Sequence, residues 1–349
     1  MTAGGPAKPL GIDDLVHSPA WLPLEPLGRD AVRLVHLDEA AYRAASFLDQ
    51  RLLIQGHAQS ACALTLVQAA ASRLAPRSHY IFHTGHAGST LISRLIGAYP
   101  GYFSLREPAL LRTLTDRQSP SAAFGMSLEA TLALLGRTWR PSERALIKAT
   151  SFVSELAEPV LATDTRAAAI LMFVDPLAHL RGILAGPNSR TEARQLGPAR
   201  LERLAGRLGE GDWRPDARSE GEWIAMSWLC EMTVLHQAAV RFASRVRWVD
   251  FDAFLGEPLA GLQAIFRRLG CEPATGEIEA LVSGPLMHQY SKAPEHPYDA
   301  ALRRTVLASA DHEHGYEIHR GMRWRAQVAQ RSALAAAVLE SSARVSAGG

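Results

Sequence analysis

The sequence is poor in features that would each point to a particular class of protein. It has three cysteines among 349 residues, Cys62, Cys230 and Cys271, which lie far apart and form no CxxC pair or zinc-type spacing. Scattered cysteines argue against a disulfide framework and fit a reducing compartment. No apolar run approaches the roughly 20 residues that span a bilayer, and residues 1–15 lack the charged and apolar regions of a signal peptide. We therefore expect a soluble cytoplasmic protein with no membrane partner.

Charge is also nearly balanced, at a net +2, so the chain has no polyanion signature and nucleic acid is not indicated as a partner. Lysine is scarce, because only Lys8, Lys148 and Lys292 occur among 37 basic residues. A chain that uses arginine almost everywhere keeps a lysine where a compact point charge matters. Lys8 lies in an N-terminal tail, so Lys148 and Lys292 are the functional candidates. The alternative for each is a surface lysine that has been retained by chance.

Apolar runs of strand length alternate with helical patterns over most of the chain. The predicted strands cover 79–84, 102–107, 144–150, 167–174 and 245–251. A helical segment follows each of them except 102–107, which Pro108 ends. Such alternation predicts an α/β fold of the P-loop type, with a central parallel sheet and helices on both faces. Apolar residues make up 47% of the chain, enough for a large core.

The ends of the chain are expected to differ from this central part. Residues 1–20 resemble a loose tail, and 41–74 follow a helical pattern that breaks at Gly56. We predict a tail and helical extension over 1–75, an α/β domain over 76–330, and a C-terminal helix or tail over 331–349.

One connection between strand and helix carries a possible anion site, HTGHAGST at 83–90. Gly85 and Gly88 allow the backbone to approach a ligand, and Ser89 and Thr90 supply hydroxyl donors at a helix start. The alternative is a glycine-containing connection without a ligand. No Gly-Lys pair occurs in the chain, and the loop lacks GxGxxG. ATP hydrolysis and nicotinamide redox chemistry therefore lose support.

This segment resembles part of a known family. The run HTGHAGSTLISRLIGAYPGYFSLREP (83–108) is similar to the 5′-phosphosulfate loop of sulfotransferases that use 3′-phosphoadenosine-5′-phosphosulfate (PAPS). The likeness is greatest to the tyrosylprotein sulfotransferase-like branch and its bacterial relatives. Further segments match in order: RALIKATSF (144–152), AAAILMFVDPLAHLRGILA (167–185), RVRWVDFDAFLGEPLAGLQAIFRRLG (245–270) and QYSKAPEHPYDAALR (289–303).

The resemblance implies roles for particular residues. The loop residues Gly85, His86, Ala87, Gly88, Ser89 and Thr90 are implied to hold the 5′-phosphosulfate. Glu107 is implied as the general base, with Lys148 and His86 beside the bridging oxygen. Two alternatives stay open, a salt bridge from Glu107 to Arg106 or Arg112 and a packing role for His86.

The segment for the 3′-phosphate departs from the family pattern. The usual Arg and Ser are replaced by Val174 and Gly182. Possible substitutes are Arg181, Ser189 and Arg190, with Arg194 nearby, or these arginines line a solvated helix face. Lys292 is expected to contact the nucleotide rather than the reacting group.

The resulting expectation is a PAPS-dependent sulfotransferase that needs no metal, releases 3′-phosphoadenosine 5′-phosphate (PAP), and acts on a hydroxyl or amine of a small molecule or peptide. The alternatives are a noncatalytic relative that binds a nucleotide or a partner, and a kinase-like phosphotransferase with a degenerate loop. The Arg-rich stretch 190–218 is either a mobile lid over the nucleotide or a solvated face. The histidine-rich stretch 311–319 is expected to be a surface loop rather than a metal site.

Overall fold

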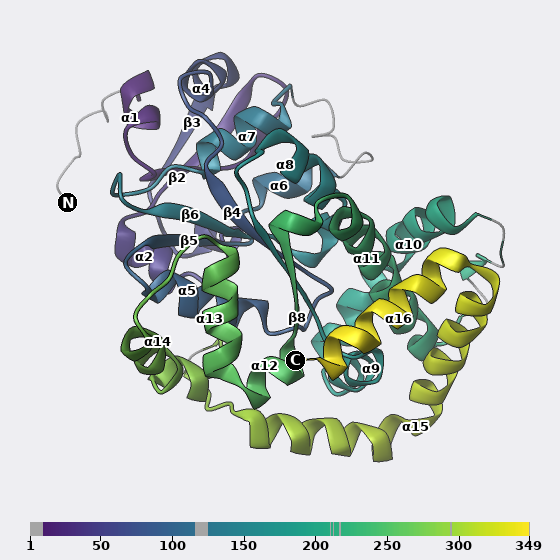
Figure 1. Ribbon diagram of the computed structural model, residues 1–349. Coiled ribbons are helices and arrows are strands. Elements are labelled where there is room, and N and C mark those ends of the chain that lie inside the picture. The colour runs from purple at the N-terminus through teal and green to yellow at the C-terminus, as the bar shows by residue number, and fades with distance from the viewer. Residues whose placement is uncertain are drawn as a thin grey trace.

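A five-stranded parallel sheet forms the centre of the protein (Figure 1). The computed structural model describes residues 10–115, 125–209, 211, 213–215, 218–293 and 295–348. The strands are β4 (Ser78–His83), β5 (Tyr102–Arg106), β6 (Arg144–Lys148), β7 (Ala169–Phe173) and β8 (Val246–Asp250). Their order is β5-β6-β4-β7-β8, and every neighbouring pair is parallel. The five predicted strands and the parallel sheet are confirmed.

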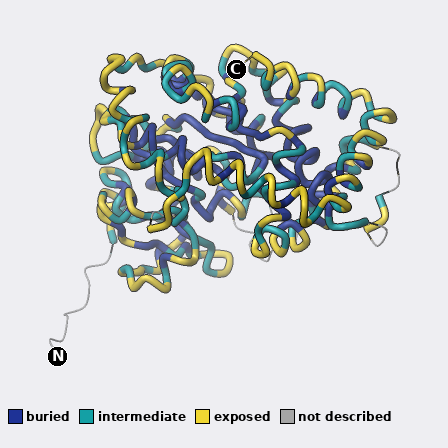
Figure 2. The backbone as a smooth tube through the Cα atoms, turned by 90° about the horizontal axis from the view of Figure 1, so that it is seen from below, coloured by how far each residue is buried: buried dark blue, intermediate teal, exposed yellow. Residues whose placement is uncertain are grey.

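Successive side chains of each strand point to opposite faces, and both faces are buried. On β4, Tyr80 and Phe82 join one apolar cluster, whereas Ile81 joins another. The first cluster includes residues of α8 (Ala157–Thr163) and α11 (Glu220–Arg241), and the second includes α5 (Ser89–Ala98) and α13 (Pro258–Arg268). Helices therefore cover both faces of the sheet, and the buried segments lie at the centre of the molecule (Figure 2). The predicted α/β fold is confirmed.

Further helical segments complete this part of the chain. They are α6 (Leu110–Thr113), α7 (Leu128–Leu135), η2 (Ser151–Leu156), α9 (Pro176–Leu184), α10 (Pro187–Leu208), η4 (Ala243–Arg245), α12 (Phe251–Gly256), α14 (Thr275–Val282), η5 (Pro285–His288), α15 (Ala300–Arg331) and α16 (Ala333–Ala347). Local signals explain several starts. Asp175 caps α9 by accepting from Leu177 N at 2.8 Å, and Pro176 fits the first turn.

The predicted helical N-terminal extension is wrong. This part contains a three-stranded antiparallel sheet of β1 (Trp21–Leu27), β2 (Ala31–His36) and β3 (Gln59–Ala63). Around it lie α1 (Ile12–Val16), α2 (Glu39–Ala44), α3 (Arg51–Ile54) and α4 (Leu64–Ala71). β3 lies inside the region predicted to be helical, because its backbone pairs with β2, which is distant in sequence. Helical periodicity does not register such pairing. Within the predicted tail, α1 is ordered, and residues 1–9 lie outside the described residues.

The N-terminal part shares its core with the parallel sheet. Leu22, Tyr42 and Leu48 belong to the same apolar cluster as Tyr80. The buried Arg137 guanidinium also donates to the carbonyl oxygens of residues 15, 18 and 21 at 2.7–2.8 Å. The extension is thus packed against the sheet, and the boundaries at 75 and 330 stay predictions.

The C-terminal region also differs from expectation. The predicted loop at 311–319 is wrong, because α15 runs through it with a kink at His314. Gly321 and Gly221 let α15 and α11 approach closely, since a Cβ on either glycine would overlap the backbone of the other helix. The Arg-rich stretch forms α10, which buries Leu201 and Leu204. No helix within the described ranges is long and apolar enough to cross a membrane.

Candidate functional site

The connection from β4 to α5 is a tight loop built from backbone in the left-handed region. Gly85, His86 and Gly88 have φ values of 85°, 51° and 64°. A Cβ on Gly88 would overlap the ring of Phe251, so both the backbone conformation and the available space require glycine. The free N–H groups at the start of α5 follow directly. This geometry is typical of anion-binding loops.

Two buried histidines lie against the loop on the side of the protein interior. The Gly85 N–H donates to His83 Nδ1 at 3.0 Å, which leaves the proton of the neutral ring on Nε2 to bond the Ala149 carbonyl at 2.9 Å. Burial lowers the pKa of His83 well below its ordinary value. Burial likewise lowers the pKa of His179, on α9, to about 3. These two rings are neutral at pH 7 and serve as hydrogen-bonding supports.

His86 occupies the position at which the resembling family has a basic residue. Part of the ring still reaches solvent, but burial lowers its pKa to about 3, and the charge of Lys292 is the next cause. In the ligand-free protein His86 is therefore neutral and offers a single hydrogen-bond donor. A bound dianion would favour its charged form. The φ of 51° is unusual for a non-glycine residue and carries strain of the kind found at ligand sites.

Glu107 and Lys148 form an ion pair at the carboxyl ends of β5 and β6. The Lys148 ammonium donates to Glu107 Oε1, and the Glu107 N–H donates to the Lys148 carbonyl at 2.7 Å. The Lys148 side chain is 0% exposed. Burial lowers its pKa from 10.5 to about 8, although the Glu107 carboxylate opposes this change. Among the described residues, Glu107 and His86 are the non-glycine positions with positive φ.

The alternative salt bridge from Glu107 to Arg106 or Arg112 is not formed. Arg106 is buried and donates instead to backbone carbonyls of residues 42, 43 and 45. The Leu48 backbone brackets Glu107, because its N–H donates to the Arg106 carbonyl at 2.8 Å and its carbonyl accepts from Ala109 N at 2.9 Å. The N-terminal part thereby sets the position of the carboxylate.

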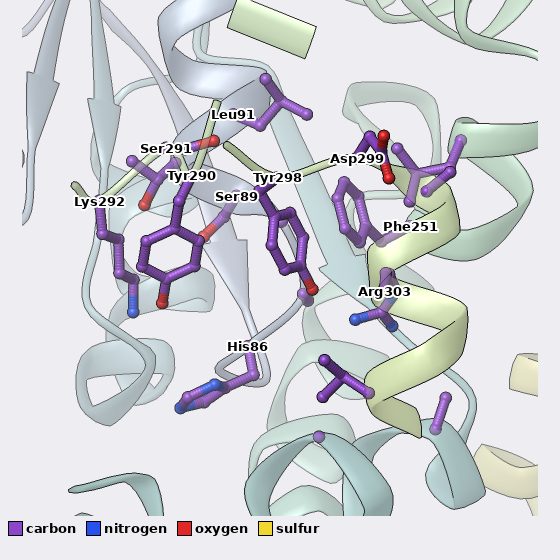
Figure 3. A pocket seen from close by; sticks show the side chains of 18 of the residues that line it. His86, Ser89, Leu91, Phe251, Tyr290, Ser291, Lys292, Tyr298, Asp299 and Arg303 are labelled. Carbon is purple, nitrogen blue, oxygen red and sulfur yellow. The ribbon is translucent and has the colours of Figure 1, made fainter. Parts of the chain in front are cut away.

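A cavity of about 280 Å³ opens in front of the loop (Figure 3). Its walls come from α5, α9, the start of α12, the segment 287–299 and the first turns of α15. Tyr290 and Tyr298 stand with ring centroids 5.5 Å apart, and Lys292 and Arg303 are the cationic side chains on the walls. Inside the loop, the buried Thr90 Oγ1 has no hydrogen-bond partner among the described residues. An aromatic wall, two cations and an unsatisfied hydroxyl fit an anionic, aromatic ligand such as a nucleotide.

The structure brings most of the predicted ligand-binding residues together. Those that line the cavity are His86, Ala87, Gly88, Ser89, Thr90, Ser189 and Lys292. Gly85 lies behind them and borders a separate small cavity of about 30 Å³ next to His179. Glu107 and Lys148 do not line the large cavity. They lie at the carboxyl ends of β5 and β6, and the strand order β5-β6-β4 sets these ends beside the loop that follows β4.

Two predicted ligands do not reach the cavity. Arg181 pairs with Asp311 of α15 at 2.6 Å, and Arg190 pairs with Glu220 of α11 at 2.7 Å. Both therefore hold helices together. These carboxylates neutralise both guanidinium groups, because α15 and α11, which are distant in sequence, pack beside them.

Sequence reasoning missed Arg303, whose guanidinium points into the cavity in Figure 3. It donates to both carboxylate oxygens of Asp252 at 2.6 and 3.0 Å, and stands 5.4 Å from the centroid of Phe251. The signal was present, since Arg303 ends the segment 289–303 that resembles a family segment over the nucleotide. The scarcity of lysine drew attention to Lys292 instead.

No metal cluster accompanies these groups. In the ranges that the structure describes, no three His, Cys, Asp or Glu side chains are grouped so that they could hold a metal ion. His312, His314 and His319 lie on α15, and His312 and His319 are exposed.

No protein-family profile and no curated protein sequence matches the chain. Among solved structures it is similar to a sulfotransferase domain from the curacin biosynthetic pathway, with 14% identity, a TM-score of 0.41, and coverage of 68% of this chain and 89% of that chain. A mouse sulfotransferase in complex with PAP has 12% identity, a TM-score of 0.43 and coverage of 78% and 93%. A Mycobacterium avium sulfotransferase has 15% identity, a TM-score of 0.40 and coverage of 86% and 89%. Because these TM-scores are below 0.5, we base the proposed function on the residues of the site.

Proposed function

We propose that the protein is a sulfotransferase that moves a sulfuryl group from PAPS to a hydroxyl or amine of an acceptor. One observation carries the proposal. A lysine-free anion loop lies next to the Glu107–Lys148 pair on the adjoining strand ends. This edge of a parallel sheet is where open α/β folds bind ligands. A loop for a phosphosulfate beside a carboxylate for an acceptor proton is what sulfuryl transfer requires.

The donor would lie in the 280 Å³ cavity. The N–H groups at the start of α5 and the hydroxyls of Ser89 and Thr90 would hold the 5′-phosphosulfate. Tyr290 and Tyr298 supply aromatic surface for the base, and Arg303 is the cation that we propose for a nucleotide phosphate in place of Arg181 and Arg190.

Glu107 would take the proton of the acceptor hydroxyl or amine as its oxygen or nitrogen forms a bond to sulfur. The bond from sulfur to the 5′-phosphate oxygen breaks, and PAP leaves with the electron pair. Lys148 holds the carboxylate in position. Since the reaction proceeds by in-line displacement, positioning and electrostatics supply most of the catalysis.

Calorimetric titration of the purified protein with PAP, ATP and adenosine 5′-phosphosulfate tests the donor. We expect selective binding of PAP. Preference for ATP would favour a kinase-like phosphotransferase instead. A folded protein that binds none of the three would refute the proposal.

A second experiment separates an enzyme from a binding protein. Glu107→Gln should lose PAPS turnover with hydroxyl and amine acceptors but keep its affinity for PAP. The matched control is Glu143→Gln, a buried glutamate that pairs with Arg140 at the opposite, amino end of β6. Unchanged turnover in Glu107→Gln would remove Glu107 as the base.

A further inference from the structure

The loop that would hold the 5′-phosphosulfate has no cation of its own. His86 is neutral in the ligand-free protein, and the charge of Lys148 is matched by Glu107. Arg303 is paired with Asp252. Charge that develops on the leaving phosphate therefore needs another cation close to the loop.

Of the two cations that line the cavity, Lys292 is the one with no carboxylate partner among the described residues. Its side chain lines the cavity together with His86 and Ser89, and Figure 3 shows it extending from the segment beside Tyr290 toward the level of His86. Among the described residues, no carboxylate lies within 4 Å of Lys292 Nζ. Burial is the largest cause of the lowered pKa of His86 and of Lys148, and the charge of Lys292 adds to it in both.

The N-terminal part of the chain holds this lysine in place. Ser46 Oγ donates to the Lys292 carbonyl at 3.0 Å, and the ammonium stands 5.7 Å from the ring centroid of Phe47. Arg94, on the helix that begins at the loop, donates to Ser46 Oγ at 2.9 Å and to the Ser291 carbonyl at 2.9 Å. Three segments that are distant in sequence thus meet around Lys292, two of them at the backbone of residues 291–292 and one, through Phe47, at the ammonium group.

We propose that Lys292 is the catalytic cation at the bridging oxygen, in place of the missing loop lysine, and that Phe47 and Ser46 of the N-terminal part are its positioning residues. The inference rests on the proposed sulfuryl transfer. It assigns Lys292 to the reacting group rather than to the nucleotide, and it gives the N-terminal part a role in the active site. The ammonium stabilises the charge that the 5′-phosphate oxygen gains as the bond to sulfur breaks, and no proton moves to or from Lys292.

Binding of PAP with and without orthovanadate tests this assignment without a known acceptor. The vanadate oxygens take the place of the transferred sulfuryl oxygens beside the 5′-phosphate. We expect vanadate to tighten PAP binding in the wild type. In Lys292→Gln this gain should fall by about 100- to 1,000-fold, the range found when one preorganised donor is removed. Affinity for PAP alone should also fall, because PAP keeps the charged 5′-phosphate oxygen, whereas affinity for adenosine 3′-phosphate, which lacks it, should change less than about threefold. Lys292→Arg should restore part of the gain, since it retains the charge.

Phe47→Leu tests the positioning role. It should reduce the vanadate gain by about two- to fivefold, the worth of a partly exposed cation–π contact, and leave affinity for adenosine 3′-phosphate unchanged. The matched control is Phe242→Leu, which removes a ring that stands 4.7 Å from Arg245 at the amino end of β8, away from the site. It should keep the full gain.

Each other outcome has a distinct meaning. If Lys292→Gln weakens adenosine 3′-phosphate as much as PAP with vanadate, Lys292 contacts the nucleotide away from the reacting oxygen and the inference is wrong, while the proposed function stands. A full vanadate gain in Lys292→Gln, or no gain in the wild type, also overturns it. A wild-type protein that does not bind PAP would refute the proposed function and this inference with it.

Discussion

Replacing Glu107 with Gln removes the partner of a fully buried ammonium, and the resulting loss of stability should depend on pH. In the wild type the Lys148 pKa is about 8, below its ordinary 10.5. Between these values the unfolded chain binds more protons than the folded one, so the contribution of Lys148 to stability rises with pH. Below pH 8 that contribution is constant. Without the Glu107 carboxylate, the pKa falls further, and Lys148 gives up its proton rather than remain charged and unpaired.

The size of the effect follows from this proton release. Removing a proton from a group with a pKa of 8 costs ~1.4 kcal/mol for each pH unit below 8. Glu107→Gln should therefore destabilise the protein by at most about 1 kcal/mol at pH 7 and about 3 kcal/mol at pH 6, and by almost nothing above pH 8. If Lys148 instead kept its proton in the variant, its unpaired buried charge would lower the free energy of unfolding by ~3–5 kcal/mol at every pH.

Urea unfolding of both proteins at pH 6, 7 and 8 measures these differences. The control is Lys148→Met in each background, which removes the titrating group and should make the effect of Glu107→Gln independent of pH. A destabilisation of equal size at pH 6 and pH 8 would refute the reasoning. So would a pH dependence that persists in the Lys148→Met background.

Three further predictions concern the loop, the nucleotide cation and the N-terminal part. Gly88→Ala should lower the free energy of unfolding by about 2–5 kcal/mol, because of left-handed strain and overlap with Phe251. Chemical denaturation measures this loss, and a smaller value would mean that the loop adjusts to the added methyl group. Arg303→Gln should weaken PAP binding about 10- to 100-fold in calorimetry, as expected for a lost charged hydrogen bond, whereas Arg181→Gln should leave it within about twofold. The reverse order would restore Arg181 as the ligand. Arg137→Met should cost about 3 kcal/mol or more, because buried carbonyls lose their donor, and thermal unfolding within a degree of the wild type would contradict this.

The sequence was sufficient for features that depend on neighbours along the chain. Each buried strand is a short apolar run, and a helical pattern separates most of them from the next, so the parallel sheet was predictable. The loop at 83–90 was predictable as well, since the glycine spacing and the following Ser-Thr pair are local.

Two further features depend on partners that are distant in sequence, and the first of them makes the helical prediction for the N-terminal part wrong. Residues 59–63 satisfy their backbone through β2, which overrides an apparent helical pattern. The assignment of Arg181 and Arg190 assumed that nearby arginines would turn to the ligand. Asp311 and Glu220 neutralise them instead, and both carboxylates come from helices that follow much later in the chain.

Local sequence thus specified the parallel strands, the glycine loop and the candidate residues Glu107, Lys148 and Lys292. Tertiary packing decided which charges remain available. It paired Lys148 with Glu107, lowered the pKa of His86 by burial, and placed Lys292 beside Phe47 with no carboxylate partner among the described residues. Residue type and spacing reveal which groups a chain contains, whereas burial and pairing, which set the energy of a charge, depend on segments that meet only in the folded protein.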